Sequence, residues 1–209
     1  MSLVFFDFDG TLTTKDTIWP FATFLWANCG RRRGARASIF LSLMKLKLHL
    51  TSNHVFKEQF MRRLVQGESK KGIESLTERF HETQLEPILN RAVVRLLLEH
   101  VEQGDDVYLV SSNFDFFLRP LQERWNVKGI FATQTEVRDG YFAGRILGRA
   151  CDGKEKLDRV IACFGERRTR EAVAYADSRS DCFLLEYVKT GHWVGPRRNP
   201  GVMRSLSQA

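Results

Sequence analysis

Two aspartates one residue apart, Asp7 and Asp9, follow an apolar run and are the first residues whose types and spacing suit chemistry. Alternate residues of an extended chain point to the same side, so both carboxylates can converge at the end of a strand formed by residues 3–6. Two carboxylates held that close repel each other, and a divalent cation is the usual remedy. The alternative is an Asx-turn that merely closes a strand, because Gly10 and Thr11 are also ordinary turn residues.

Polar groups also end two further apolar runs of the sequence. Ser111 and Ser112 follow residues 107–110, and Asp177 follows residues 172–176. In an open parallel sheet the ligand site lies outside the carboxyl ends of the strands. The three strand ends therefore predict one shared site for a metal and a phosphate.

Strands that alternate with helices from residue 88 onward predict an α/β fold, a doubly wound parallel sheet with helices on both faces. Between residues 15 and 87 the sequence instead predicts one helix after another, so we expect a helical domain at 15–87 inserted into a core formed by 1–14 and 88–209. The expected helices are 16–28, 36–50, 53–66, 71–84, 88–103, 114–125, 154–164 and 179–188, with strands at 107–111, 130–132, 172–177 and 192–194 and a hairpin at 136–142.

The net charge of +7 favours an anionic partner. The basic clusters follow no known nucleic-acid module, so we expect no nucleic-acid partner. The four cysteines show no C-x-x-C spacing, and the first strand begins almost at Met1, so we expect a reduced, cytoplasmic protein. The basic clusters are Arg31–Arg33 with Arg36, Lys70–Lys71, Arg167–Arg168 with Arg170, and Arg197–Arg198.

The longest stretch without a charged side chain, residues 17–30, is shorter than the roughly 20 residues that a membrane-spanning helix needs. Residues 38–50 are apolar enough to lie on a bilayer, but Lys45 and Lys47 interrupt them. We expect this segment to pack as a helix within the small domain, with peripheral membrane contact as the alternative.

The elements Asp7-Phe8-Asp9-Gly10-Thr11, Ser111, a lysine of Gly153-Lys154-Glu155-Lys156, and Asp177 with Asp181 resemble, in order and spacing, the four motifs of the haloacid dehalogenase superfamily. The resemblance covers almost the whole chain and implies a Rossmann-like core. A helical insertion between the first and second motifs resembles the phosphoserine-phosphatase-like subfamily IB, in which such an insertion is a cap domain.

The resemblance implies a phosphatase that works through an aspartyl phosphate. Asp7 would be the nucleophile, and Asp9 would serve as general acid and then as general base. A halide leaving group needs no proton, so an acid at position 9 favours phosphoryl chemistry over dehalogenation. The phosphate would be bound by Ser111, the Ser112 N–H, Thr11 and a lysine, for which Lys156 fits the spacing better than Lys154.

The resemblance also implies a Mg²⁺ ion as cofactor. The ligands would be the Asp7 carboxylate, the backbone carbonyl of Asp9 and the Asp177 carboxylate. Asp181 would support the metal or its waters; the alternative is a solvated or capping acid. Hard oxygen ligands of this kind are what Mg²⁺ prefers.

The insertion bears on the substrate, which would be a small phosphorylated metabolite or a phospholipid headgroup. Asp16 stands where phosphoserine phosphatases place a glutamate, and Met61 stands where they place a carboxylate-binding arginine, with Arg62 just after it. This departure counts against phosphoserine, while some relatives of this branch dephosphorylate phosphatidylglycerophosphate. The aromatic side chains Trp19, Phe21, Phe24 and Trp26 either form the core of the insertion or an apolar lip for a lipid.

Two other functions stay open. A phosphotransferase would pass the phosphoryl group from Asp7 to an alcohol, and a non-catalytic module would bind a phosphate or a membrane without turnover. The sequence does not indicate the oligomeric state.

Overall fold

The computed structural model describes residues 1–29, 33–48 and 50–195, which divide into two units. The core unit comprises Met1–Lys15, Ile88–Ala132 and the chain from Cys151 onward, and the helical unit comprises Asp16–Pro87 and Thr133–Ala150. The basic residues Arg31, Arg32, Arg197 and Arg198 lie outside the described residues.

A five-stranded sheet in the order β3-β2-β1-β6-β7 forms the centre of the core unit. The strand β1 (Leu3–Phe6) pairs in parallel with β2 (Asp106–Phe114) and with β6 (Val173–Ala176), and β6 pairs in parallel with β7 (Thr190–Trp193). The edge strand beside β2 is β3 (Gly129–Thr133). All four residues of β1 are buried, as a central strand covered on both faces requires.

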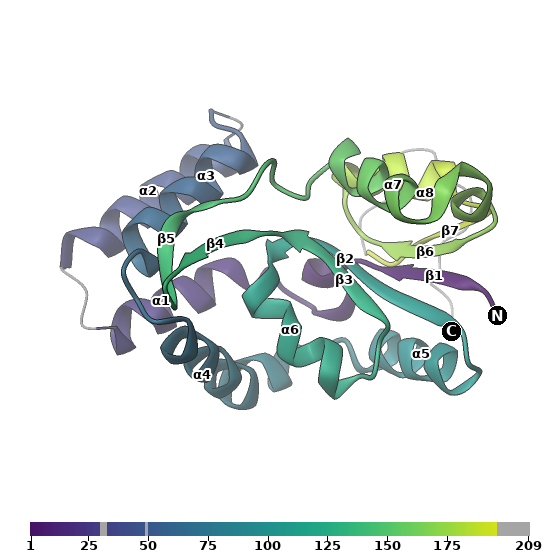
Figure 1. The fold of residues 1–209 in the computed structure, drawn as a ribbon, viewed down its shortest axis with the longest axis horizontal. Coiled ribbons are helices and arrows are strands. Elements are labelled where there is room, and N and C mark those ends of the chain that lie inside the picture. Colours follow the sequence, from purple (N-terminus) through teal and green to yellow (C-terminus); the bar gives the residue numbers. More distant parts are fainter. Residues whose placement is uncertain (30–32, 49, 196–209) are drawn as a thin grey trace. The chain divides into compact units, whose positions relative to one another are not determined.

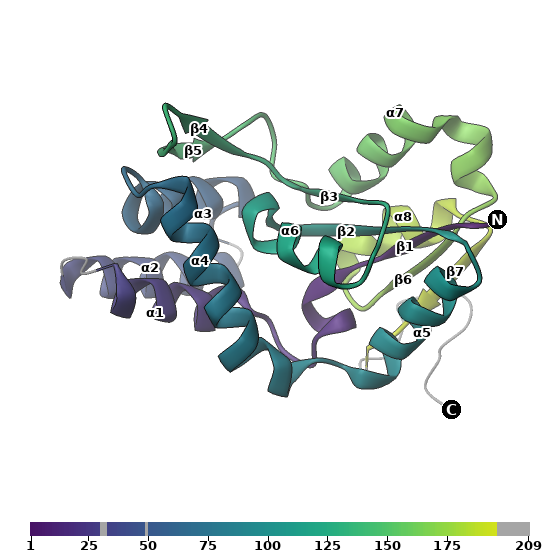
Figure 2. The ribbon, with the colours of Figure 1, turned by 60° about the horizontal axis from the view of Figure 1, so that its bottom comes forward.

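Four helices cover the two faces of this sheet (Figures 1 and 2). They are α5 (Arg91–Glu102), α6 (Asp115–Arg124), α7 (Lys154–Arg170) and α8 (Cys182–Tyr187). On one face Phe5 packs with Val160 and Leu184, and on the other Phe6 stacks on Tyr175 with ring centroids 4.5 Å apart. The expected doubly wound α/β fold is therefore confirmed.

Two elements of the core unit run further than the sequence predicts. The strand β2 continues to Phe114, whereas the sequence predicts its end at Ser111. The helix α7 breaks at Gly165, whose φ is +76°, directly after the predicted end at Phe164, and a further helical segment continues to Arg170.

Four helices form most of the helical unit: α1 (Ile18–Asn28), α2 (Arg33–Lys47), α3 (Asn53–Phe60) and α4 (Lys70–Phe80). The helices α3 and α4 each continue through a wider turn, η2 (Met61–Val65) and η3 (His81–Leu85), so the expected helices 53–66 and 71–84 are confirmed. Phe21 and Phe24 both pack edge-on against Phe80. No helix in the described part of the chain combines the length and the hydropathy needed to cross a bilayer.

The hairpin of β4 (Thr135–Arg138) and β5 (Tyr141–Ile146) belongs to the helical unit, whereas the sequence boundaries assigned it to the core. The backbone explains this grouping, since Gly67 N–H donates to the Phe142 carbonyl (2.9 Å) and Phe142 N–H donates to the Glu68 carbonyl (3.0 Å). The Asp139-Gly140 signal fixes the turn but carries no information about which segment the hairpin joins.

Candidate active site

Asp7 lies directly after β1, at the carboxyl end of the sheet. Its N–H donates to the Tyr175 carbonyl (2.9 Å), which continues the pairing of β1 with β6 by one residue. One carboxylate oxygen, Oδ1, accepts from Lys156 Nζ at 2.7 Å, and the other, Oδ2, accepts from Thr11 Oγ1 at 3.3 Å. The central strand thus delivers a buried carboxylate whose orientation is fixed on both sides.

The turn after Asp7 requires glycine at position 10 for two reasons. Its φ of +87° is a conformation that side-chain-bearing residues rarely adopt, and a Cβ built there would lie 2.2 Å from Asp177 Oδ2. The Thr13 hydroxyl accepts from the Gly10 N–H (3.1 Å) and holds the turn in place. Gly10 therefore allows Asp177, from a strand far along the chain, to reach the first loop.

Lys156 points into the site from the first turn of α7. Its ammonium contacts Asp7 and also forms an ion pair with Asp181. Burial by itself lowers the pKa of this lysine, but the carboxylates of Asp181 and Asp7 outweigh it and raise the pKa above its ordinary value. Lys154, the other candidate, is exposed and pairs with Asp158 at 2.8 Å on the surface.

Three carboxylates gather around this one ammonium. Asp7, Asp177 and Asp181 each offer an oxygen, and these oxygens lie within 4.8 Å of one another. Burial, reinforced by Asp181, raises the pKa of Asp177 to about 6. Burial also raises the pKa of Asp7 well above its usual value, with Asp181 and Asp177 adding to the effect while Lys156 opposes it. The site therefore carries more negative charge than Lys156 can balance.

A divalent cation such as Mg²⁺ fits this set of donors. All three groups are hard oxygen ligands, and the single hydroxyl hydrogen of Thr11 is shared between two of them, since Oγ1 lies 3.3 Å from Asp7 Oδ2 and 3.2 Å from Asp177 Oδ1. Burial raises the pKa of Asp7 and of Asp177, and a bound metal would add positive charge beside these carboxylates to that of Lys156. Among the described residues, the Asp9 carboxylate does not belong to this group. The sequence-based hypothesis likewise gave Asp9 only its backbone carbonyl as a metal ligand.

Ser111 is buried within the end of β2. Its Oγ accepts from the Asn113 N–H (3.1 Å). Ser112 also belongs to β2, whereas the sequence placed it near the start of the following helix, which begins only at Asp115.

Asn113 is a site residue that the sequence reasoning missed. Its side-chain Nδ2 donates to Asp9 Oδ2 at 3.0 Å, so it orients the second aspartate. The signal was present, because residues two apart on a strand share a face and Asn113 stands two after Ser111.

The remaining predicted residues, Asp16, Met61 and Arg62, lie in the helical unit. Asp16 Oδ1 accepts from the Ile18 N–H (2.8 Å) at the start of α1, Met61 is fully buried, and Arg62 is exposed. The role of these three residues at a phosphate stays a prediction.

The fold is that of a known class of enzymes. The model of the haloacid dehalogenase-like hydrolase family matches residues 4–186, and the chain belongs to this family. The resemblance found in the four motifs is thereby confirmed: the protein is a haloacid dehalogenase-like hydrolase, and it is similar to phosphoserine phosphatases.

Individual relatives are distant in sequence. The chain is 26% identical to protein CicA of Caulobacter vibrioides over 88% of this chain and 81% of that relative. It is also 26% identical to a phosphoserine phosphatase of Polaromonas sp., over 88% of this chain and 74% of that relative.

Among solved structures, a Bordetella pertussis Tohama I protein of unknown function superposes with a TM-score of 0.81 at 25% identity, over 94% of this chain and 91% of that chain. A phospho-aspartyl intermediate analogue of phosphoserine phosphatase superposes with a TM-score of 0.66 at 18% identity, over 99% of this chain and 93% of that chain. The similarity to the phosphoserine phosphatase structure supports the fold.

Proposed function

We propose that the protein is a Mg²⁺-dependent phosphatase that hydrolyses phosphate monoesters through an aspartyl phosphate on Asp7. One observation carries this proposal: a buried carboxylate at the end of the central strand faces Lys156 at 2.7 Å and shares its surroundings with two further acids. Phosphate monoesters hydrolyse very slowly unaided, and a covalent intermediate divides the reaction into two easier steps.

In the first step a carboxylate oxygen of Asp7 attacks phosphorus while the ester P–O bond breaks. The departing alkoxide takes a proton from the Asp9 carboxyl, which Asn113 orients. In the second step Asp9 removes a proton from water as the water oxygen attacks phosphorus, and the bond between phosphorus and Asp7 breaks. Inorganic phosphate leaves, and both aspartates return to their starting states.

Lys156 and the end of β2 bind the phosphoryl oxygens in this proposal. The ammonium lies beside the attacking carboxylate, where it offsets charge that develops on the transferring group. The Ser111 hydroxyl and the Ser112 N–H supply hydrogen bonds from the neighbouring strand. Bound Mg²⁺, held by Asp7, Asp177 and the Asp9 carbonyl and supported by Asp181, would supply the positive charge that lets an anionic nucleophile meet an anionic phosphate.

The proposed substrate is a small phosphorylated metabolite or a phospholipid headgroup, with the helical unit acting as a cap that selects the leaving group. The name of the Polaromonas relative supports monoester hydrolysis. Met61 carries no charge, so the carboxylate of phosphoserine would lack a partner at that position, and burying it unpaired would cost several kcal/mol, on the order of 3. A cytoplasmic location completes the proposal.

Phosphate release from p-nitrophenyl phosphate tests this function. We expect turnover with Mg²⁺, none with EDTA, none in Asp7→Asn, and wild-type turnover in the matched surface variant Asp158→Asn. Transfer to added glycerol in preference to water would instead identify a phosphotransferase. No turnover here or with a panel of phosphorylated metabolites and lipids, in a folded protein that binds Mg²⁺, would refute the proposal in favour of a non-catalytic module.

A further inference from the structure

The helix α2 carries apolar side chains on two of its sides. Ile39 and Leu43 face inward and are buried, with Ser42 beside them. With 3.6 residues per turn, positions 40, 41, 44 and 48 fall together on a different side. These four side chains form what we call the apolar stripe, and their exposed fractions are 50% for Phe40, 56% for Leu41, 38% for Met44 and 61% for Leu48.

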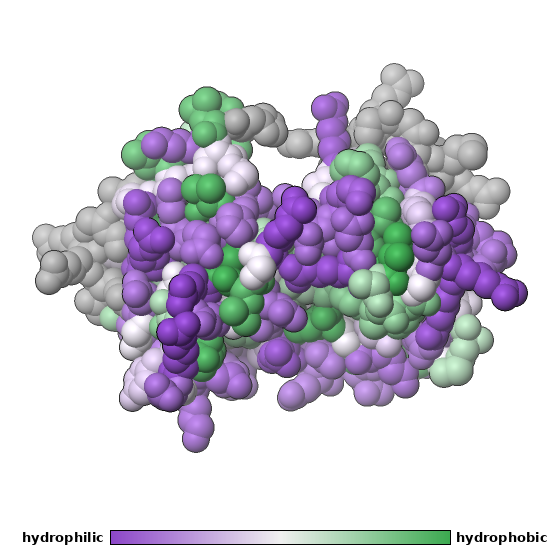
Figure 3. All heavy atoms as spheres, turned by 45° about the horizontal axis from the view of Figure 1, so that its top comes forward, coloured by the Kyte–Doolittle hydropathy of each residue, from purple (hydrophilic) through white to green (hydrophobic). Residues whose placement is uncertain are grey.

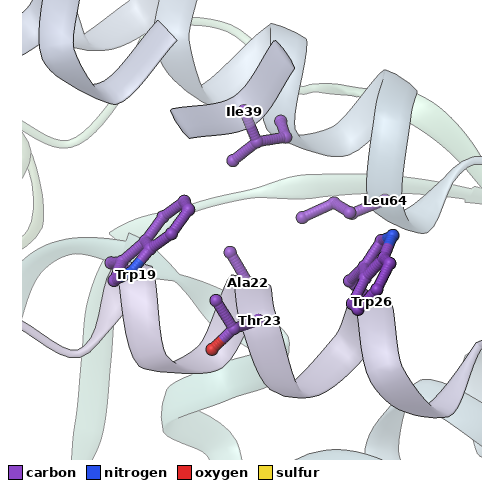
Figure 4. A pocket seen from close by; sticks show the side chains of 6 residues that line it. All are labelled: Trp19, Ala22, Thr23, Trp26, Ile39 and Leu64. Atoms are coloured by element: carbon purple, nitrogen blue, oxygen red, sulfur yellow. The ribbon is translucent and has the colours of Figure 1, made fainter. Parts of the chain in front are cut away.

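Single exposed apolar residues are common on proteins, but contiguous ones mark interaction sites. On the face drawn in Figure 3, hydrophilic surface predominates and hydrophobic surface is confined to small patches. The stripe also adjoins a further apolar feature, because the Phe40 ring packs edge-on against Trp19, 5.2 Å between centroids. Trp19 lines one end of a small hollow in the helical unit, with Trp26 at the other end and Ile39 and Leu64 between them (Figure 4).

The charge of this segment indicates the sign of the charge on its partner. The helix α2 contains four basic residues and no acidic one, and Lys45 lies exposed next to the stripe. Between Asp16 and Glu58 the sequence holds seven arginines and lysines and no acid, and of these Lys57 is buried in α3. A partner of this surface therefore carries negative charge.

Three kinds of partner can be compared on these grounds. A second copy of the chain would bring one basic segment against another, which like-charge repulsion disfavours. A nucleic acid would match the charge but offers little to an aliphatic stripe of leucine and methionine. An anionic bilayer matches both features, since basic residues pair with its headgroups and apolar side chains enter the acyl boundary.

We infer that the outer side of α2 binds the surface of an anionic lipid bilayer through the apolar stripe and Lys45, in a segment whose sequence is basic. The inference rests on the proposed function in one respect: it names the surface at which the phosphatase would meet a lipid substrate. Binding itself requires no turnover, so the two can fail independently.

Co-sedimentation with vesicles tests the inference. The full chain is mixed with phosphatidylcholine vesicles with or without phosphatidylglycerol, at low and high salt, and phosphate release from p-nitrophenyl phosphate is measured on the same samples. The test variant is Leu41→Asn with Leu48→Asn. The control is Leu98→Asn with Phe183→Asn, which changes two exposed apolar residues of the core unit.

We expect the wild type and the control to pellet with phosphatidylglycerol vesicles and to be released by salt. The stripe variant should bind about tenfold more weakly or worse, because each lost leucine removes apolar burial, while it keeps its fold by circular dichroism and its p-nitrophenyl phosphate turnover. Wild-type protein that stays in the supernatant, or a stripe variant that binds like the control, would overturn the inference. A wild-type dimer that the stripe variant dissolves would also overturn it and identify a second copy as the occupant. Loss of turnover with intact vesicle binding would refute only the phosphatase proposal.

Discussion

Replacing Lys156 with methionine tests whether this one ammonium stabilises the carboxylate cluster. Its side chain is 3% exposed, and Nζ contacts Asp7 and Asp181. Removing one partner of a buried ion pair leaves an uncompensated buried charge, at a cost of about 3–5 kcal/mol. We expect the free energy of unfolding to fall by that amount in urea denaturation at pH 8 with EDTA present, and turnover of p-nitrophenyl phosphate to vanish.

The loss of unfolding free energy in Lys156→Met should depend on pH, and the carboxylates decide whether it is larger at high or at low pH. Burial already raises the pKa of Asp7 and of Asp177 above their usual values, and removal of the lysine raises them further. A carboxyl whose folded pKa exceeds its unfolded pKa destabilises the fold when ionised, so the penalty is full at high pH and disappears as the groups take up protons. We expect the deficit of Lys156→Met at pH 8 to shrink at pH 5.

The matched control for this experiment is Lys154→Met, two residues earlier on the same helix. Lys154 forms a surface pair with Asp158 at a spacing of four residues, and its side chain is 66% exposed. Such pairs contribute about 0.5 kcal/mol or less. Equal losses in the two variants, or a loss in Lys156→Met that is the same at pH 5 and pH 8, would refute this account of the site.

Three further predictions follow from the same geometry. Gly10→Ala should lower the melting temperature and weaken the increase in melting temperature that Mg²⁺ produces, because the new Cβ meets Asp177. The control is Gly67→Ala, at a similar φ but with open space around it, which should show only the backbone strain of about 1–2 kcal/mol. Asn113→Leu should reduce kcat about tenfold through loss of the hydrogen bond to Asp9, and an unchanged kcat would remove Asn113 from the site. Burial raises the pKa of Asp105, but the Ser2 N–H and His100 outweigh it and hold this pKa below its usual value. Asp105→Asn should therefore be less stable than the wild type at pH 7. The difference in unfolding free energy between Asp105→Asn and the wild type should become smaller when urea denaturation is repeated below about pH 4. A larger difference at that pH would contradict a lowered pKa for Asp105.

Local signals were sufficient to predict the sheet and the polar residues that follow β1 and β6, although β2 continues to Phe114, beyond its predicted end. The run Leu3–Phe6 followed by Asp7 contains both the burial of the central strand and the break that ends it. Apolar runs ending at Ser111 and Asp177 repeat the pattern, and parallel pairing then brings the ends together. The fold class and the family followed from these few residues.

Features that depend on contacts between distant segments could not be predicted in this way. The hairpin around Gly140 shows its own turn in the sequence, but its attachment to Glu68 is a backbone contact across some seventy residues. The outward side of α2 was equally hidden, because Ile39 and Phe40 are both apolar and only the packing decides which one is buried.

The attachment of β4 and β5 to the helical unit also governs how this chain can be divided. Excising only Asp16–Pro87 would leave Phe142 and Ile146, both now buried, without their covering, and the remaining protein would be prone to aggregate. A soluble minimal core therefore requires that Thr133–Ala150 be replaced by a short linker as well. Any exchange of this unit between relatives, in the laboratory or in evolution, must transfer two separate stretches of the gene together.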